Sequence, residues 1–260
     1  MEALIELKDI LLRSEDHLIL DRVSVGFPPG QSTVIMGPSG CGKSTLLKVA
    51  AGLTVPDAGE VLVQGQPLAR FTQRKLMELR GSSGFMFQDA ALWANKTIYE
   101  NLALPLQVHR PSLTAARLKE RVLGLLARLG LAGSAGLLPA QMSMGEAKAA
   151  SFLRAVILEP ALLFLDEPTP SLDHELLEKM MRMIRELRDR GCTIIAVTHD
   201  AHLTSMIASH LVVLKEGRVL EAADLATVRR SRSPEVMAIL SQVLSEAATY
   251  DTDLLDLLGG

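Results

Sequence analysis

The 260-residue chain has few aromatic residues, only two cysteines and no excess of positive charge. Phenylalanine, tyrosine and tryptophan make up 3% of it, which argues against the aromatic stacking platforms that bind single-stranded nucleic acid. The formal net charge of -3 argues against a general basic coat, so no nucleic-acid partner is expected. Two distant cysteines, Cys41 and Cys192, do not suggest a disulfide framework, and a reducing cytosol fits.

The chain also lacks a long, unbroken apolar run. Prolines and glycines interrupt the uncharged stretches 23–42 and 129–145, whereas a membrane-spanning helix needs about 20 mainly apolar residues. The acidic N-terminus does not have the basic region and apolar core of a secretory signal. Hydrophobic residues still make up 48% of the chain, enough for a full core in one large domain or one with an insert.

Short apolar strands alternate with amphipathic helices along most of the chain. This order favours an α/β fold with a parallel sheet and crossover helices. The mainly helical block 93–154 interrupts the order as an insert, and Thr114 is predicted to be the N-cap of its best helix. Strands are predicted at 5–7, 18–20, 23–25, 32–36, 60–63, 84–87, 161–165 and 193–197, and helices at 44–51, 114–129, 174–190 and 234–248.

A glycine-rich segment at 37–45, GPSGCGKST, lies between a predicted strand and a predicted helix. It matches the phosphate-loop pattern G-x-x-x-x-G-K-[ST], in which backbone amides wrap phosphate groups. Lys43 would reach the β- and γ-phosphates, and the Ser44 hydroxyl would bind Mg²⁺. The motif alone does not separate a kinase, a GTPase, a helicase and a transport ATPase. The predicted nucleotide-binding residues here are Gly37, Ser39, Gly40, Cys41, Gly42, Lys43, Ser44 and Thr45.

Three further strands end in residues suited to phosphoryl chemistry. Asp166 follows the strand 161–165 and suits Mg²⁺ binding through water, while Glu167 could polarise a water for attack on the γ-phosphorus. His199 follows the strand 193–197 and can donate a hydrogen bond to a γ-phosphate oxygen. Gln88 ends the strand 84–87, and its amide can contact Mg²⁺ or the attacking water.

The order of these motifs resembles that of the ATP-binding cassette family, over about residues 3–220. The resemblance implies an α/β P-loop NTPase with a RecA-like, mostly parallel core sheet, an N-terminal antiparallel β subdomain and an inserted α-helical subdomain. It implies a nucleotide-binding domain at 1–228, with the helical subdomain at about 89–155, and a helical tail at 229–260. The motifs that carry it are the phosphate loop, Gln88, Ser143-Met144-Gly145-Glu146, Asp166-Glu167-Pro168-Thr169, Ser171-Leu172-Asp173 and His199.

The family resemblance also implies roles and partners. Two copies of the chain would face each other head to tail at the cytoplasmic face of the membrane, hydrolyse ATP with Mg²⁺ and drive a membrane permease. Ser143 and Gly145 would contact the other copy's γ-phosphate, and Asp173 would lie in the D-loop that crosses the dimer interface. The implied catalytic residues are Glu167, His199 and Gln88, and the implied metal ligands are Ser44, Asp166 and Gln88.

The sequence departs from the family pattern in two places. Met144 stands where the signature motif has its first glycine. Ser143 and Glu146 also fit a capping box, an alternative that needs no contact with ATP. The segment 11–16 has no aromatic residue to stack on adenine, so Arg13 either lies over the base or is a solvated loop arginine.

A narrower resemblance joins residues 86–93, 99–106 and 233–236 to cassettes that serve MCE-domain lipid transporters, which move phospholipid between bacterial inner and outer membranes. It implies MCE-domain and small accessory cytoplasmic subunits as partners. Import of amino acids or other solutes is the alternative within transport, and a non-transport cassette is the alternative outside it. The residues expected to line a groove for the permease, unless they pack inside the helical subdomain, are Phe87, Ala91, Leu92 and Trp93.

The C-terminal tail carries two apolar groups. Val236, Ile239, Leu240, Val243 and Leu244 recur at helical spacing, which is typical of a stripe that packs on its own domain. Four leucines at 254, 255, 257 and 258 follow an acidic stretch and could instead dock on the second copy or on an accessory subunit.

Overall fold

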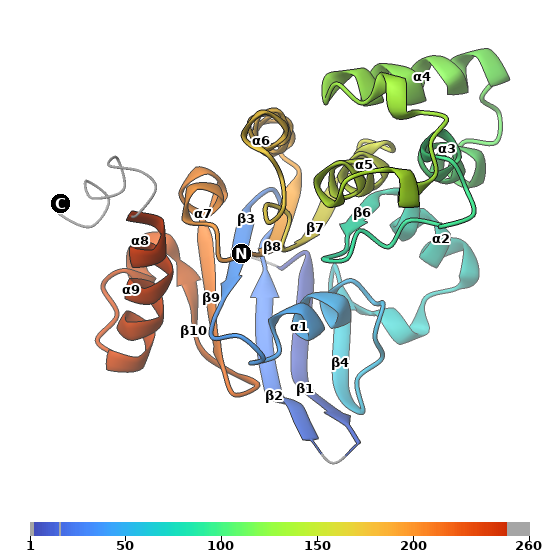
Figure 1. Ribbon diagram of the computed structural model, residues 1–260. Coiled ribbons are helices and arrows are strands. Elements are labelled where there is room, and N and C mark those ends of the chain that lie inside the picture. The colour runs from blue at the N-terminus through green and yellow to red at the C-terminus, as the bar shows by residue number, and fades with distance from the viewer. Residues whose placement is uncertain (1–2, 16, 249–260) are drawn as a thin grey trace. The chain divides into compact units, whose positions relative to one another are not determined.

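The computed structural model describes residues 3–15 and 17–248, with side chains up to residue 241 (Figure 1). The chain forms two compact units. Unit 1 combines the described residues up to Arg70 with those from Ile194 onward, and unit 2 spans Phe71–Thr193. None of the helices in the described ranges is long and apolar enough to cross a membrane. The predicted domain limits at 155 and 228 stay predictions.

Unit 1 contains the predicted N-terminal antiparallel sheet. Its strands are β1 (Ile5–Ser14), β2 (His17–Phe27), β4 (Ala58–Val63) and β5 (Gln66–Pro67), in the order β2-β1-β4-β5. Every neighbouring pair in this order is antiparallel. Ile5 and Leu7 of β1 are buried on one face, as the alternation predicts. Both long strands extend beyond the short segments that the sequence indicates.

In unit 1, the residues predicted to contact the nucleotide follow strands that are mainly parallel. Strand β3 (Ser32–Met36) pairs in parallel with β8 (Thr193–Val197) and with β9 (His210–Lys215), and β10 (Arg218–Asp224) pairs antiparallel with β9. All residues of β3 and β8 are buried, as expected of strands covered on both faces. Helix α1 (Lys43–Ala50) follows β3, and α7 (Ala201–Ile207) follows β8.

The tail helix belongs to unit 1. A short helix α8 (Leu225–Val228) leads to α9 (Pro234–Ala248), which packs against α7 (Figure 1). Val236, Ile239 and Leu240 are buried, which confirms that this part of the stripe packs on its own domain. The remaining members of the stripe and the four leucines from 254 onward lie outside the described side chains.

Unit 2 combines two parallel strands with five α-helices. Strands β6 (Ser83–Met86) and β7 (Leu162–Asp166) pair in parallel, with Met86 opposite Leu165. Helix α5 packs against β6 and α3 (Figure 1). The Thr114 side chain accepts a hydrogen bond from the Arg117 amide, so it caps α4 as predicted. The helices of this unit are α2 (Gln73–Gly81), α3 (Ile98–His109), α4 (Ala115–Arg128), α5 (Met144–Val156) and α6 (His174–Asp189).

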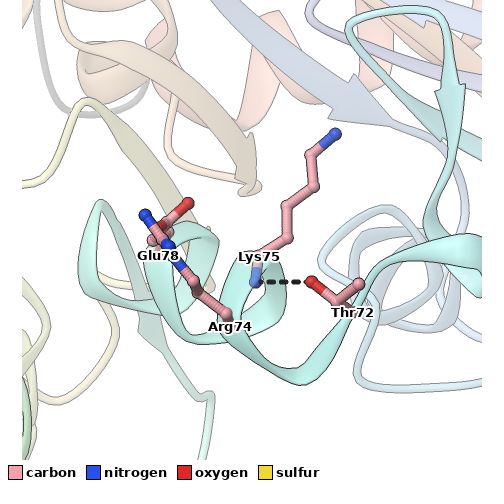
Figure 2. Close-up of polar contacts among 4 residues, drawn as sticks. All are labelled: Thr72, Arg74, Lys75 and Glu78. Carbon is pink, nitrogen blue, oxygen red and sulfur yellow. Dashed lines mark hydrogen bonds and ion pairs between the residues drawn. The ribbon is translucent and has the colours of Figure 1, made fainter.

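Helix α2 has no counterpart among the predicted elements. None of its residues is buried, and its only large apolar residues are Leu76, Met77 and Leu79, so the apolar pattern is too short to reveal it. Local polar contacts hold it instead. The Thr72 hydroxyl accepts a hydrogen bond from the Lys75 amide at 3.3 Å, and Arg74 pairs with Glu78 at 2.9 Å (Figure 2).

Candidate nucleotide site

The phosphate loop connects β3 to α1 in unit 1. Gly37, Cys41 and Lys43 are buried, Ser39 and Gly40 are exposed, and Ser44 and Thr45 lie partly exposed in the first turn of α1. The Lys43 ammonium donates hydrogen bonds to the carbonyl oxygens of Gly37 and Pro38, at 2.8 Å each. Its charge is therefore held inside the curve of the loop, where a phosphate chain would lie.

Gly42 marks the start of α1 and needs to be glycine for two reasons. Its φ of 103° lies in the left-handed region, and a β-carbon there would come within 2.8 Å of the Ile19 carbonyl oxygen. The first turn of α1 carries no acidic side chain. The positive end of the helix dipole thus favours an anion at this end.

His199 lies in unit 1 directly after β8. Because β3 and β8 are parallel neighbours, with Ile35 opposite Val197, the phosphate loop and His199 leave the same edge of the sheet. Asp200 caps α7 by accepting a hydrogen bond from the Leu203 amide at 2.8 Å. The cap fixes the turn that carries the half-buried His199.

Asp166 and Glu167 lie in unit 2 at the end of β7. Their exposed fractions are only 1% and 9%. Glu167 has a φ of 45°, a left-handed conformation that is costly for a residue with a β-carbon. Its carbonyl oxygen accepts a hydrogen bond from the Lys148 ammonium at 2.8 Å. Burial lowers the pKa of Lys148, against the opposing effect of the Glu167 and Asp166 carboxylates.

Gln88 follows β6 and is exposed. Since β6 and β7 run parallel with Met86 opposite Leu165, Gln88 leaves the same edge of the sheet as Asp166 and Glu167. Ala90 and Ala91 follow with positive φ values of 64° and 46°. Unit 2 therefore gathers the predicted amide and both predicted carboxylates at one edge.

The signature segment begins helix α5. Ser143 is the N-cap, and its hydroxyl accepts a hydrogen bond from the Glu146 amide while Glu146 accepts one from the Ser143 amide. The capping box is thus confirmed, and it accounts for both residues without a ligand. Met144 is 76% exposed at the first helical position. A β-carbon on Gly145 would come within 2.5 Å of the Ser171 carbonyl oxygen, so this glycine permits close packing on the segment at Ser171.

Two other predicted residues have structural roles in this chain. Asp173 is exposed and caps α6 by accepting a hydrogen bond from the Leu176 amide at 2.8 Å. Arg13 is exposed on β1, and its amide donates to the Asp57 carboxylate at 2.7 Å. These contacts explain why each residue is held where it is, and they leave the predicted D-loop role of Asp173 untested.

Unit 2 contains a hollow of about 420 Å³ in the region where a permease groove is predicted. Phe87, Ala91 and Trp93 line it as expected, whereas Leu92 is not among its lining residues. Trp93 is 55% exposed, so its ring is open to a partner. Arg80, His109 and Arg154 add basic groups to this groove. Burial and the adjacent arginines Arg110 and Arg80 lower the pKa of His109.

A family model described as ABC transporter matches residues 20–170. The chain belongs to the ABC transporter family. The matched range holds the phosphate loop, Gln88, Ser143, Asp166 and Glu167, and it ends before Asp173 and His199. This ABC transporter ATPase therefore binds ATP and is an ATP-hydrolysing enzyme coupled to transport, with the P-loop NTPase fold.

Curated relatives of this ABC transporter ATPase include lipid and solute systems. The intermembrane phospholipid transport system ATP-binding protein MlaF of Escherichia coli K12 is 32% identical over 97% of this chain and 96% of its own length. MlaF of Haemophilus influenzae is 33% identical over 92% and 90%. The methionine import ATP-binding protein MetN of Cereibacter sphaeroides is 37% identical over 83% of this chain but 61% of its own length.

Solved cassettes share the fold. One is a dimeric ATP-binding cassette in a post-hydrolysis state with ADP and Pi, with a TM-score of 0.78 and 30% identity over 85% of this chain and 98% of its own. Another is an ATP binding subunit of an ABC transporter, with a TM-score of 0.79 and 25% identity over 95% and 100%.

Sequence reasoning missed one group of residues beside the site. Lys148 of α5 donates a hydrogen bond to the backbone carbonyl of Glu167, and Ser151 and Arg154 donate to the carbonyls of Ala90 and Ala91 after Gln88. A signal was available, because polar residues at three-residue intervals in a largely apolar helix are each neighbours of the next.

Proposed function

We propose that this chain is the ATPase subunit of a transporter that moves phospholipid between bacterial inner and outer membranes. It works as a head-to-tail pair on the cytoplasmic face of the inner membrane, against a permease with MCE-domain and accessory subunits. The observation that carries this proposal is the share of each relative's own length that this chain spans. The chain spans 96% of the Escherichia coli phospholipid protein but 61% of the methionine import protein.

Solute import is the second candidate. It is favoured by the higher identity, 37% over 218 residues, to the methionine import protein. The match to that protein leaves out more than a third of its length, whereas the match to the phospholipid protein leaves out almost none. We therefore place phospholipid transport first.

Hydrolysis would proceed by attack of water on the γ-phosphorus of ATP. The water oxygen forms a bond to phosphorus, the bond from phosphorus to the oxygen that bridges to the β-phosphate breaks, and ADP and phosphate leave. Glu167 orients the water and accepts its proton, and Lys43 neutralises charge on the phosphates. His199 donates a hydrogen bond to a γ-phosphate oxygen. The buried position of Glu167 supports this assignment, because it shields the carboxylate from bulk water.

The donor set also fits Mg²⁺. The Ser44 hydroxyl, the buried Asp166 carboxylate and the Gln88 amide oxygen are hard oxygen donors of the kind that Mg²⁺ prefers. When bound, the ion neutralises charge that develops on the β- and γ-phosphate oxygens. In this chain Ser44 is fixed by the first turn of α1 and Asp166 by the end of β7.

In the proposed pair, Ser143 and Gly145 of one copy meet the γ-phosphate held by the other, beside the D-loop residue Asp173. The N-terminus of α5 supports this role, since the helix dipole favours an anion there. Met144 is compatible with the role because its side chain points into the open, at 76% exposure. A solved cassette of the same fold is dimeric with ADP and Pi bound, which supports the pairing of two copies.

The groove of unit 2 supports docking of a permease helix. Phe87 and Trp93 with Leu104, Pro105 and Val108 make an apolar surface, and Arg80 and Arg154 supply positive charge beside it. An amphipathic helix with an apolar face and acidic flanks would match this surface. Trp93 is the expected anchor, because exposed tryptophans in such grooves carry much of the binding energy.

The test is co-purification from detergent-solubilised membranes of the cells that encode the chain. We expect the wild type to bring down a polytopic membrane protein together with phospholipid, identified by mass spectrometry. Trp93→Ala should reduce recovery at least about tenfold, since an aromatic hot spot is often worth 2 kcal/mol or more. The matched control is Val55→Ala, an 85% exposed residue of unit 1, which should recover the complex fully.

The alternatives give different results in the same experiment. A solute-import permease without enriched phospholipid would contradict lipid transport and favour import. Equal recovery of the membrane protein by Trp93→Ala and the wild type would contradict the docking role of the groove. Whether the complex carries phospholipid would still be decided by mass spectrometry.

A further inference from the structure

Helix α5 carries a row of residues at three-residue intervals. Gly145, Lys148, Ser151 and Arg154 each neighbour the next along this row, which winds around the helix, because residues three apart on a helix are neighbours. Lys148 and Ser151 are 7% and 0% exposed, so both polar side chains are enclosed. The row thus needs buried partners.

Each member of the row meets a backbone carbonyl. Lys148 donates to Glu167 at 2.8 Å, and Ser151 donates to Ala90 at 2.6 Å. The Arg154 guanidinium donates to Ala91 at 2.8 Å and to Ala90 at 3.2 Å. At Gly145 the missing side chain makes room for the Ser171 carbonyl oxygen.

The residues that offer these carbonyls share an uncommon backbone conformation. Ala90, Ala91, Glu167 and Ser171 have φ values of 64°, 46°, 45° and 71°, all in the left-handed region. This region costs roughly 1–2 kcal/mol for a residue with a β-carbon, and such residues keep it only where the surroundings hold them. The row on α5 supplies hydrogen bonds to Ala90, Ala91 and Glu167, and at Ser171 its glycine leaves room for the carbonyl.

We propose that Lys148 is a positioning residue for ATP hydrolysis. Its ammonium holds the Glu167 carbonyl and so keeps Glu167 in the left-handed turn that aims the carboxylate. Ser151 and Arg154 do the same for the turn after Gln88, so one rigid helix sets both turns. Lys148 hydrogen-bonds the backbone carbonyl of Glu167, so the role assigned to it is to position this residue. The inference rests on the proposed role of Glu167 in water activation.

The test compares three substitutions by steady-state ATPase kinetics. Lys148→Met keeps the length of the side chain but removes the donor, so kcat should fall about 10- to 100-fold, as expected of a misplaced catalytic group. The KM for ATP should stay within about twofold, because the phosphate loop is untouched. Lys148→Arg retains a donor and should recover most of kcat. The exposed Lys119 of α4 is the matched control, and Lys119→Met should leave both constants unchanged.

A double substitution separates positioning from a general structural role. If Lys148 acts through Glu167, adding Lys148→Met to Glu167→Gln should not lower the residual rate further. A further loss of tenfold or more in the double variant would overturn the proposal, and so would an unchanged kcat of Lys148→Met alone. Lys148→Ala provides the same comparison if Lys148→Met is not recovered folded.

The proposed function fails in a different way. Normal turnover of Glu167→Gln by itself would remove Glu167 from the mechanism, and the positioning role with it. Loss of turnover in Glu167→Gln combined with full activity of Lys148→Met would leave the catalytic assignment intact and reject only the role of Lys148.

Discussion

Cys41 illustrates how one side chain of the phosphate loop is controlled by its surroundings. Its buried thiol donates a hydrogen bond to the Leu214 carbonyl oxygen at 3.4 Å. Burial raises its pKa against the opposing effect of the Lys43 charge. Because the thiolate is the nucleophile, a raised pKa means less reactive thiolate at neutral pH than in a free thiol.

We therefore predict slow, pH-dependent alkylation of Cys41. In a Cys192→Ser background, iodoacetamide should react more slowly than with glutathione at pH 7, and the rate should keep rising above the pH at which glutathione levels off. Mg-ATP should protect Cys41, and the alkylated protein should lose ATP binding. Mass spectrometry of the modified protein and a nucleotide-binding assay measure both effects.

The second cysteine provides the comparison. Burial raises the pKa of Cys192 to about 12, so a Cys41→Ser protein, which keeps only Cys192, should be alkylated still more slowly. Alkylation of Cys41 at the rate of a free thiol would contradict the raised pKa, and alkylation without protection by Mg-ATP would place this thiol away from the nucleotide.

Individual residues differ in how far sequence reveals them. The capping box of Ser143 and Glu146 follows from local spacing and is confirmed. The contact of Lys148 with Glu167 joins positions 19 residues apart, and its partner is a backbone atom that no side-chain pattern marks. The left-handed φ of Glu167 is equally hidden, because it arises from packing rather than from glycine.

At the scale of elements, strands made of an unbroken apolar run between clear turn signals could be predicted from the sequence. Strands β9 and β10 and helix α2 could not. Strands β3 and β8 have the predicted bounds, since all their residues are buried. Strand β10 alternates between exposed and half-buried residues, so it has no apolar face to read. Strand β9 has four buried residues, yet a short apolar run does not by itself separate strand from helix.

Helix α3 fixes the segment after Gln88 through one side chain. Asn101 is fully buried; its oxygen accepts from the Trp93 amide at 2.8 Å, and its amide group donates to the carbonyls of Trp93, Lys96 and Thr97. Asn101→Ala should lower the free energy of unfolding by about 2–4 kcal/mol, because several backbone groups lose their partner.

Urea denaturation followed by tryptophan fluorescence measures this effect at the segment itself, since Trp93 is the only tryptophan of the chain. Asn95→Ala in the same segment is the control. Asn95 is exposed, so this change should stay within about 0.5 kcal/mol. Equal midpoints for the two variants would show that Asn101 does not hold the segment.

At the scale of the whole molecule, the order of motifs carried more information than composition. Hydrophobic content of 48% was compatible with several classes of protein, and only the sequence of phosphate loop, signature, acidic strand and histidine pointed to an ABC transporter ATPase. The motifs are distributed over both units, with the phosphate loop and His199 in unit 1 and the remaining predicted residues in unit 2.

Because the predicted motif residues lie in both units, their joint role has to be tested on the intact chain. The property to measure is dimerisation of the chain that depends on nucleotide. Glu167→Gln preserves the size of the side chain but removes the base, so the variant should bind ATP without hydrolysing it. If ATP lies between two copies, the uncleaved nucleotide should hold them together. We expect a dimer in size-exclusion chromatography with light scattering when Mg-ATP is present, and a monomer when it is absent.

Two controls make the result specific to bound ATP. Lys43→Ala removes the charge inside the phosphate loop, so Glu167→Gln combined with Lys43→Ala should stay monomeric at the same ATP concentration. The wild type should dimerise only transiently, because hydrolysis removes the γ-phosphate that both copies contact. A Glu167→Gln protein that binds ATP with unchanged affinity and remains monomeric would contradict the head-to-tail site. In a monomer, the signature segment of one copy does not contact the γ-phosphate held by another copy.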